Sequence, residues 1–442
     1  MNKLRFMIPS FIGVLIFLTP LPWDGALTIG IGIITGFVKG LMGEYGLHIV
    51  VGFMVITSVL TILGTVFGAG WIRRHTTLKE LFDVPAIWLV LRLIGTIFGL
   101  VYLFQIGPEI LTSEEIGGAV FVGIGISVVA IYISACLLMP LLTDFGLMEF
   151  VGTLSRPVFR RVFRLPGSSA IDAVTSFVGA ASIGLLITIR QYDQGNYTAR
   201  EASVIATNFS IVSIPFCLVV ASVAGIEHLF ISWYAFVVLA CLLAALITPR
   251  LPPLSRKADN YVSGSRENVA KRTHEPKSLL HEAWVRAMER AGTAPGVREY
   301  FAICVKNMMF FLFSVLTAAM ALATIAAVIT FHTPVFTWLG YPFIALLEFA
   351  QLPDATAAAP AMLSGYLDQF IPAIVASGID SNATSFVLAG LSVCQLIFMS
   401  EVGVIILRSS LPLGIAELSL IFLLRTAIVL PVLILGAHLI VG

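Results

Sequence analysis

Long runs of apolar residues, separated by short polar turns, dominate this sequence. The runs lie near 5–22, 48–70, 86–105, 117–139, 228–248, 301–331, 335–351 and 414–440. A helix needs about 20 apolar residues to cross the hydrocarbon core of a bilayer. Only 12% of the 442 residues are charged and the mean hydropathy is +0.99, whereas soluble domains carry about 25% charged residues. We therefore predict an all-α polytopic membrane protein.

Two further apolar stretches, one in each half of the chain, are interrupted by polar residues with Gly and Pro. The first lies at 172–215 and the second at 359–407. An unpaired polar group is costly in hydrocarbon, so such interruptions persist only where they line a cavity or are buried in protein. Paired interruptions in two halves are typical of a transporter's binding site. We expect two re-entrant hairpin or broken-helix elements, among about 10–11 membrane segments.

The two interruptions have a similar layout, which favours an internal repeat. Aligning the turn at Asn196–Thr198 with that at Asn382–Thr384 gives an offset of 186 residues. The chain then divides into a helical bundle at 1–165, a first repeat at 166–249, a hydrophilic linker at 250–298, and a second half at 299–442 with the second repeat.

Charge places the linker on one side of the membrane. It holds ten Lys and Arg residues against five Asp and Glu, so the positive-inside rule makes it cytoplasmic, with the N-terminus on the same side. Arg164 and Arg250 are both assigned to the cytoplasmic side, so the chain must cross the membrane an even number of times between them. Three apolar stretches lie in that interval, and we therefore predict that 168–190 is a re-entrant hairpin that returns to the cytoplasm. Leu280, Trp284 and Met288 recur at helical spacing, which fits an amphipathic helix on the membrane surface; a solvated linker is the alternative.

Polar side chains within the interruptions are candidates for binding a solute. Hydroxyl and amide groups there can bind a polar molecule or a desolvated cation. The candidates are Ser176, Ser182, Asn208, Ser210, Gln395 and Ser400. For an individual Ser, a hydrogen bond to its own helix is the competing interpretation.

Carboxylates in the same stretches are candidates for ion coupling: Asp172, Asp368 and Glu401. We place Glu401 near the middle of a helix, where a lone carboxylate costs about 2.5–3.5 kcal/mol. It is therefore expected to face a cavity or cation, or to be paired or protonated. Arg92 and Arg425 also lie in apolar runs. Each is expected to pair with Glu348, Glu401 or Asp368, or to bind an anionic solute group.

Motifs for enzyme chemistry are missing from the sequence. It has no P-loop, and its close glycine pairs lack the third glycine of a dinucleotide site. The five cysteines lie in apolar segments without paired spacing and are interpreted as packing residues. We expect a protein that is not an enzyme and has no metal site and no cofactor. The net charge of +1 argues against a nucleic-acid partner.

The run FVGAASIGLLITIRQYDQGNYTAREASVIATNFSIVSIPF resembles the Gate, or nucleoside-recognition, domain. This layout also occurs in spore maturation proteins A and B, in the membrane part of bacterial ferrous-iron transporters and, more distantly, in concentrative nucleoside transporters. The segment FLTPLPWDGALTIGIGIITGFVKG and the chain length resemble the YjiH family of bacterial inner-membrane proteins. The resemblance implies two Gate-like repeats, the second a weaker copy at 356–407, and an inner-membrane location.

The leading functional prediction is a secondary-active transporter of a small polar organic solute: a nucleoside, amino acid or dipeptide. Its coupling ion is expected to be Na⁺ or H⁺, and its partners are the solute and the lipid bilayer. An ion or divalent-metal permease is one alternative. A non-transporting scaffold or sensor is another, in which the 250–298 loop meets a cytoplasmic partner; the same loop also offers a surface for homo-oligomer contacts.

Overall fold

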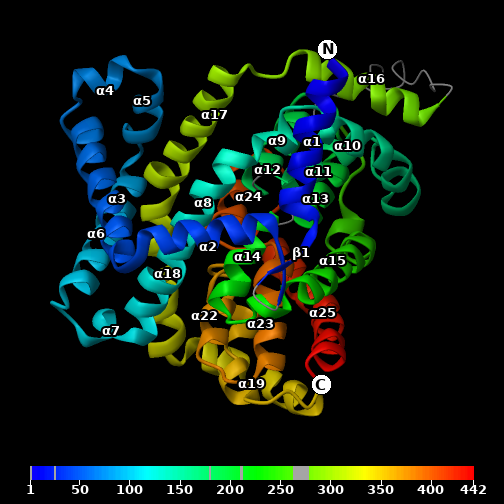
Figure 1. The fold of residues 1–442 in the computed structure, drawn as a ribbon. Coiled ribbons are helices and arrows are strands. Elements are labelled where there is room, and N and C mark those ends of the chain that lie inside the picture. The colour runs from blue at the N-terminus through cyan, green and yellow to red at the C-terminus, as the bar shows by residue number, and fades with distance from the viewer. Residues whose placement is uncertain (1, 24–25, 179–180, 210–212, 262–277) are drawn as a thin grey trace.

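A computed structural model describes residues 2–23, 26–178, 181–209, 213–261 and 278–442, without side-chain positions at 2, 26–27, 175–178 and 181–183. The described residues are almost entirely helical (Figure 1). Their one sheet is an antiparallel hairpin of β1 (Pro20–Trp23) and β2 (Ala26–Ile29). The prediction of an all-α polytopic membrane protein is confirmed.

The helices of the first half run from the N-terminus to the end of the hydrophilic linker. In chain order they are α1 (Asn2–Leu18), α2 (Gly30–Met42), α3 (Gly46–Thr61), α4 (Gly70–Arg74), α5 (Thr76–Phe82), α6 (Ala86–Phe104), α7 (Glu109–Thr112), α8 (Ser127–Leu138), α9 (Pro140–Thr143), α10 (Leu147–Val158), α11 (Ser169–Val178), α12 (Ala181–Asp193), α13 (Ala199–Asn208), α14 (Ile214–Val223), α15 (Phe230–Ile247) and α16 (Leu279–Gly292). π-Helical turns extend α3 through Ile62–Val66 and precede α8 at Glu114–Ile126.

The second half is built from nine further described helices. They are α17 (Val297–Phe310), α18 (Leu316–His332), α19 (Pro334–Phe349), α20 (Ala355–Ala358), α21 (Ala361–Ser364), α22 (Ile371–Ser377), α23 (Asn382–Cys394), α24 (Val402–Arg408) and α25 (Ile415–Ile440). A π-helical turn at Phe311–Val315 joins α17 to α18.

In the described part of the chain, six helical stretches are long and apolar enough to cross a membrane: Gly30–Val66, Ala86–Phe104, Glu109–Thr143, Glu227–Arg250, Val297–His332 and Ile415–Ile440. The predicted runs at 86–105, 117–139, 228–248, 301–331 and 414–440 fall on five of them, and the run at 48–70 overlaps Gly30–Val66. The predicted first span is different, because α1 ends at Leu18 and the β1–β2 hairpin follows. The run at 335–351 forms the shorter apolar helix α19, of 16 residues.

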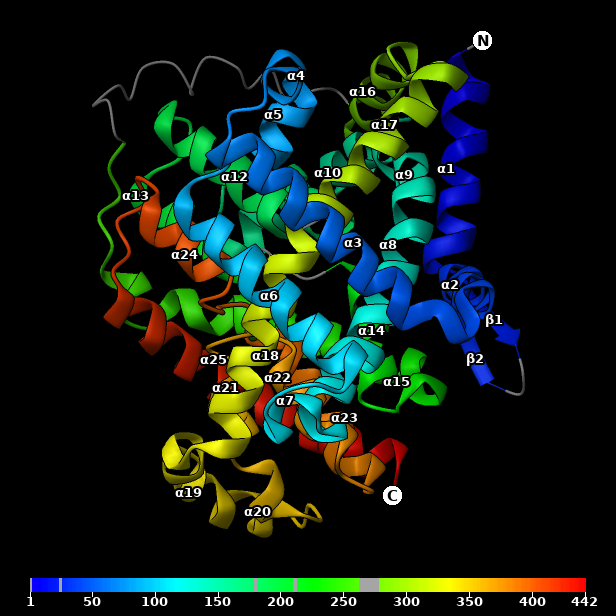
Figure 2. The ribbon, with the colours of Figure 1, turned by 90° about the vertical axis from the view of Figure 1, so that its left-hand side faces the viewer.

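The N-terminal bundle does not stand apart from the second half. Helices α3, α6, α17 and α18 gather at one side of the molecule, with α15 and α25 at the other (Figures 1 and 2). Gly95 allows α6 to approach α18 closely, because a Cβ there would lie 2.3 Å from the carbonyl oxygen of Thr317. Small residues permit such close helix crossings in membrane proteins.

The two interrupted regions share one order of elements. In the first, α12 leads through a turn to α13, and the half-helix α14 and the long helix α15 come next in the chain; in the second, α22, α23, α24 and α25 follow in that order. A side-chain cap starts α13 at Thr198 and α23 at Ser381. The helices α13 and α23 end at Asn208 and Cys394, which are related by the 186-residue offset.

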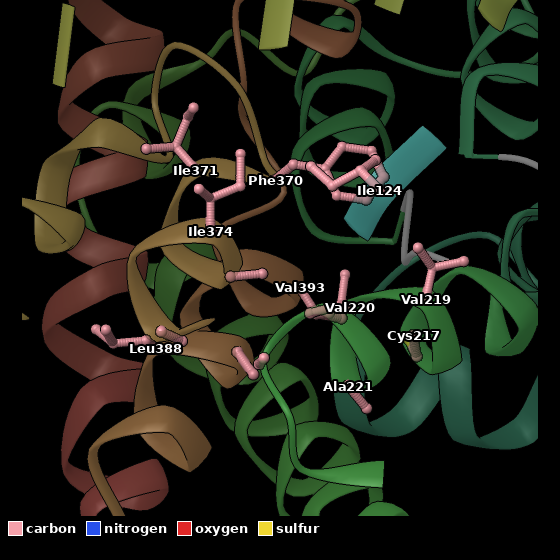
Figure 3. Close-up of a cluster of buried hydrophobic side chains, with 14 of the residues drawn as sticks. Ile124, Cys217, Val219, Val220, Ala221, Phe370, Ile371, Ile374, Leu388 and Val393 are labelled. Carbon is pink, nitrogen blue, oxygen red and sulfur yellow. The ribbon is translucent and has the colours of Figure 1, made fainter. Parts of the chain in front are cut away.

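Contacts between the two regions are reciprocal. Helix α12 packs on α24, while α14 packs on α22, and the two long helices α15 and α25 lie side by side. They are antiparallel, since Phe236 near the start of α15 meets Gly436 near the end of α25, and Lys257 beyond α15 pairs with Glu417 at 2.6 Å. Figure 3 shows part of this junction, where Val220 of α14 lies with Ile374, Leu388 and Val393 in one buried cluster.

The expectation that Glu401 lies within a helix is wrong. Helix α23 ends at Cys394, residues 395–398 have no regular secondary structure, and Glu401 is the N-cap of α24. Leu396 has a positive φ of 60°, and the amides of Met399 and Ser400 bond to the carbonyls of Tyr366 and Leu367 instead of continuing the helix.

The amphipathic helix in the linker is present as α16, but its apolar face packs on protein. Trp284 and Met288 pack with Phe6 and Phe150 from α1 and α10, whereas Leu280 is 61% exposed. Ion pairs fasten the other side: Arg156 and Arg286 to Glu282, and Arg290 to Asp144 and Glu149. The helix therefore joins α1 to α10.

Candidate functional site

Arg425 joins the two interruptions inside the molecule. It lies on α25 and is fully buried. Its Nη1 donates to the Asn208 Oδ1 at 2.8 Å, and its Nε and Nη2 donate to the Cys394 carbonyl at 3.1 and 2.8 Å. Asn208 is held in turn by bonds from its Nδ2 to the Val204 carbonyl and the Thr207 hydroxyl. One guanidinium thus bridges the ends of α13 and α23.

Gln395 lies immediately beyond the end of α23, at the start of the unwound segment. Its Nε2 donates to the Met362 carbonyl at 2.8 Å and to the Thr426 hydroxyl at 3.0 Å. These two acceptors fix the orientation of the amide, so the other amide atom is the oxygen. A Cβ on Gly365 would lie 2.2 Å from that oxygen. The glycine therefore leaves room for the Gln395 Oε1.

Three buried side-chain oxygens of the second interruption make no hydrogen bond in the structure. They are the Ser364 Oγ, the Gln369 Oε1 and the Gln395 Oε1. Leaving a buried polar group unbonded costs about 1–3 kcal/mol. Three such acceptors within one interrupted region are therefore the strongest sign of a ligand-binding position in this part of the chain.

Asp368 holds the loop that faces the unwound segment. Its Oδ1 accepts from the Phe370 amide at 2.8 Å, and Ser400 adjoins its carboxylate. Nearby, the Ser392 hydroxyl donates to the Gln369 carbonyl. The predicted residues Asp368, Gln395 and Ser400 thus lie in one connected region.

Asp172 has a different environment. It is buried on α11 and accepts a hydrogen bond of 2.6 Å from the Tyr197 hydroxyl, which precedes α13. This hydrogen bond ties α11 to the turn that precedes α13. The other candidates of the first interruption, the side chains of Ser176 and Ser182 and the whole of Ser210, lie outside the described residues.

The expected carboxylate partners of the two intramembrane arginines are not found among the described residues. Arg92 is buried, with Nη1 donating to the Thr61 hydroxyl and the Leu81 carbonyl at 2.7 and 2.8 Å. Its Nη2 donates to both oxygens of Ser314 at 3.2 Å. Neither Arg92 nor Arg425 forms an ion pair in the described part of the chain, and both are held by neutral oxygens.

Two apolar cavities lie beside α11 and α14. One, of about 270 Å³, is lined by residues of α1, α10 and α14; the other, of about 300 Å³, lies between α10, α14 and α15, and Val174 borders both. Neither is lined by Gln369 or Gln395. The unbonded oxygens are themselves buried, so they lie away from both cavities and from solvent. No group of three His, Cys, Asp or Glu side chains suited to a metal occurs among the residues that the structure describes.

The sequence did not single out several residues that build this site. The sequence marks Arg425 as a charge in an apolar run but does not indicate that it links the interruptions, and it does not distinguish Ser364, Gln369 and Tyr197 as site residues. Gln369 adjoins Asp368 and Tyr197 adjoins the Thr198 cap, so proximity to an interruption was the available signal. Asn208, a predicted candidate, lies within the first interruption, but nothing in the sequence links it to Arg425.

Comparison with known proteins places the chain in a family. It is 44% identical over 437 residues to the uncharacterized protein BpOF4_10220 of Alkalihalophilus pseudofirmus, covering 99% of this chain and 94% of that protein. The chain belongs to the family of that protein. Residues 125–227, from the start of α8 to beyond α14, match the Gate family, described as "Nucleoside recognition". No solved structure matches.

The Gate match confirms the resemblance at the first interruption. It includes α11 to α14, and with them Asp172 and Asn208. The protein is a multi-pass membrane protein with a Gate domain, of transporter-like type. A Gate-like copy at 356–407 and membership of the YjiH family stay predictions.

Proposed function

We propose that this Gate-domain protein is a secondary-active transporter of a small polar organic solute. A nucleoside, an amino acid or a dipeptide fits the prediction, with Na⁺ or H⁺ as the coupling ion. The protein resides in a bacterial inner membrane, with its N-terminus and the 250–298 loop in the cytoplasm. It needs no other cofactor and performs no covalent chemistry.

The observation that carries the proposal is the set of unbonded oxygens of Ser364, Gln369 and Gln395. A solute that presents N–H or O–H donors satisfies them, which offsets a burial cost of about 1–3 kcal/mol for each oxygen. Acceptors enclosed beside unwound backbone favour a donor-rich organic solute over a bare apolar ligand.

The arrangement of the two regions supports transport. Broken helices from two halves of a chain, packed reciprocally, are typical of transporters that expose a central site to each side in turn. Here α12 packs on α24 and α14 on α22, and the oxygens are enclosed. Motion of one region against the other would open them to either side.

A thermal-shift screen with purified protein tests the solute. Nucleosides, amino acids and dipeptides are each added with and without Na⁺, and the best ligand is then used as a tracer in proteoliposomes. A ligand at a hundredfold excess over its Kd stabilises the folded protein by about 2.7 kcal/mol. Gln395→Ala and Gln369→Ala are expected to lose both the shift and the uptake.

Gln194→Ala is the matched control, because Gln194 is exposed in the turn after α12. It is expected to keep the shift and the uptake. If Gln395→Ala and Gln369→Ala bind and transport as well as the unchanged protein, the site is placed wrongly. If no solute of these classes binds and none is taken up, the proposed function is wrong.

Asp172, Asp368 and Glu401 remain our candidates for ion coupling, and Glu401 is the sharpest test. It lies at the N-cap of α24, directly after Ser400, whose amide bonds to the Leu367 carbonyl. Glu401→Gln is expected to reduce ion-driven uptake at least tenfold while leaving exchange of solute across the membrane measurable. Uptake with unchanged ion dependence would remove Glu401 from the mechanism.

A further inference from the structure

The Arg425 guanidinium occupies a position where two helices end. Asn208 is the last residue of α13, and Cys394 is the last residue of α23. Both bond to the same guanidinium, at 2.8 Å to the Asn208 Oδ1 and at 2.8 and 3.1 Å to the Cys394 carbonyl. The Cys241 thiol of α15 adjoins the same group. Arg425 therefore touches elements of both interrupted regions.

Electrostatics explains why no carboxylate is needed there. The C-terminus of a helix carries a partial charge of about −0.5, because its last carbonyls lack partners within the helix. The end of α23 presents this partial charge to Arg425 through the Cys394 carbonyl, and the end of α13 adds the dipole of the Asn208 amide oxygen. The Cys394 carbonyl accepts two of its N–H groups, and no described carboxylate forms an ion pair with it.

The position has no second arginine related by the repeat. The residue 186 positions before Arg425 is Leu239 on α15, which is 46% exposed. The antiparallel pair of α15 and α25 thus supplies one cation for two converging helix ends. In transporters with broken helices, the C-terminal ends of half-helices and unwound carbonyls are places where coupling cations bind.

We propose that the ends of α13 and α23 form a cation-binding site whose permanent occupant is the Arg425 guanidinium. The oxygens of Asn208 and Cys394 are its ligands. In the unchanged protein this position binds neither Na⁺ nor an anionic solute group, because the guanidinium fills it. Removing the side chain opens the site to a free cation, of which guanidinium itself is the best match. The inference stands whether or not the protein transports a solute.

Chemical rescue of the full-length protein in detergent tests the site. Arg425→Ala is expected to lower the midpoint of thermal unfolding, and millimolar guanidinium chloride is expected to raise it again by at least about 3 °C. Urea at the same concentration gives no rise, and NaCl a smaller one. The unchanged protein and Arg298→Ala, which removes an exposed arginine, are expected not to gain from guanidinium.

Two further variants decide the matter even if Arg425→Ala does not fold. Arg425→Lys keeps the charge and Arg425→Met keeps the length without it. A cation site requires that Lys is tolerated better than Met, with Met lowering the midpoint strongly. The proposal is wrong if the Arg425→Met protein is as stable as the unchanged protein. It is also wrong if guanidinium stabilises Arg425→Ala no more than it stabilises Arg298→Ala.

Discussion

The two interrupted regions use the same order of helices and differ in how they satisfy their polar groups. The first meets Arg425 with a side chain, the Asn208 amide, and ties Asp172 to Tyr197 within itself. The second meets Arg425 with a main-chain carbonyl, at Cys394, and leaves three buried oxygens unbonded. Among the described residues the second region therefore has the capacity for a ligand, and the first supplies the link that holds the pair together.

The two contacts to Arg425 also differ in how strongly they depend on the amino-acid sequence. A carbonyl acceptor exists at any residue, so the second region can bond Arg425 whatever side chain stands at 394. The first region depends on an amide side chain at one position. Two regions with one layout can therefore tolerate very different substitutions at equivalent positions.

The largest expected effect follows from that difference. Asn208→Leu removes an acceptor of a buried guanidinium and should cost about 2–3 kcal/mol of stability. Cys394→Ala, at the equivalent position, keeps the carbonyl and should cost about 1 kcal/mol for the lost sulfur contacts. Unfolding in detergent measures both. Equal losses would show that the two helix ends hold Arg425 in the same way.

A side chain added at Gly365 should destabilise the second region strongly, even when it is only a methyl group. A Cβ there would lie 2.2 Å from the Gln395 Oε1, so Gly365→Ala must displace an amide that bonds to Met362 and Thr426. We expect a loss of about 1–3 kcal/mol together with loss of ligand-dependent stabilisation. Retained ligand binding in this variant would place the solute away from Gln395.

The starts of α13 and α23 allow a smaller comparison. Thr198 forms a reciprocal capping box with Glu201, while Ser381 only accepts from the Thr384 amide. Thr198→Ala should cost about 1 kcal/mol and Ser381→Ala somewhat less, because one of the two caps satisfies more amides. Thermal unfolding of the two single variants ranks them, and the reverse order would show that the capping box adds nothing.

The smallest effect concerns pH at the α16 contact, outside both regions. Burial raises the pKa of the Asp144 and Glu149 carboxyls above their ordinary range, although Arg290 opposes the rise. Since the folded chain then holds these protons more tightly than the unfolded chain, stability falls as the pH rises through the window between the two pKa values. Asp144→Asn with Glu149→Gln should flatten that fall. An unchanged pH slope would show that these carboxyls do not contribute.

Hydrophobic runs predicted the long helices well, because a bilayer-spanning helix needs little beyond apolar length. Glycine, proline and polar residues located the two interruptions, and the spacing of Leu280, Trp284 and Met288 predicted α16. The break after Cys394 was missed, because Leu396–Val404 is largely apolar and its pattern favours a continued helix. Only the carbonyls of Tyr366 and Leu367, which bond to Met399 and Ser400, explain the unwinding.

The sequence by itself determined that this chain lies in a membrane and where its two interrupted regions lie, since both follow from local hydrophobicity and backbone preference. Tertiary structure decided which groups satisfy the charges. Arg425 bonds to Asn208, 217 positions away, and not to any of the carboxylates that the sequence offered. A buried charge takes its partner from whichever helix ends converge on it, and that convergence is a property of the packed fold.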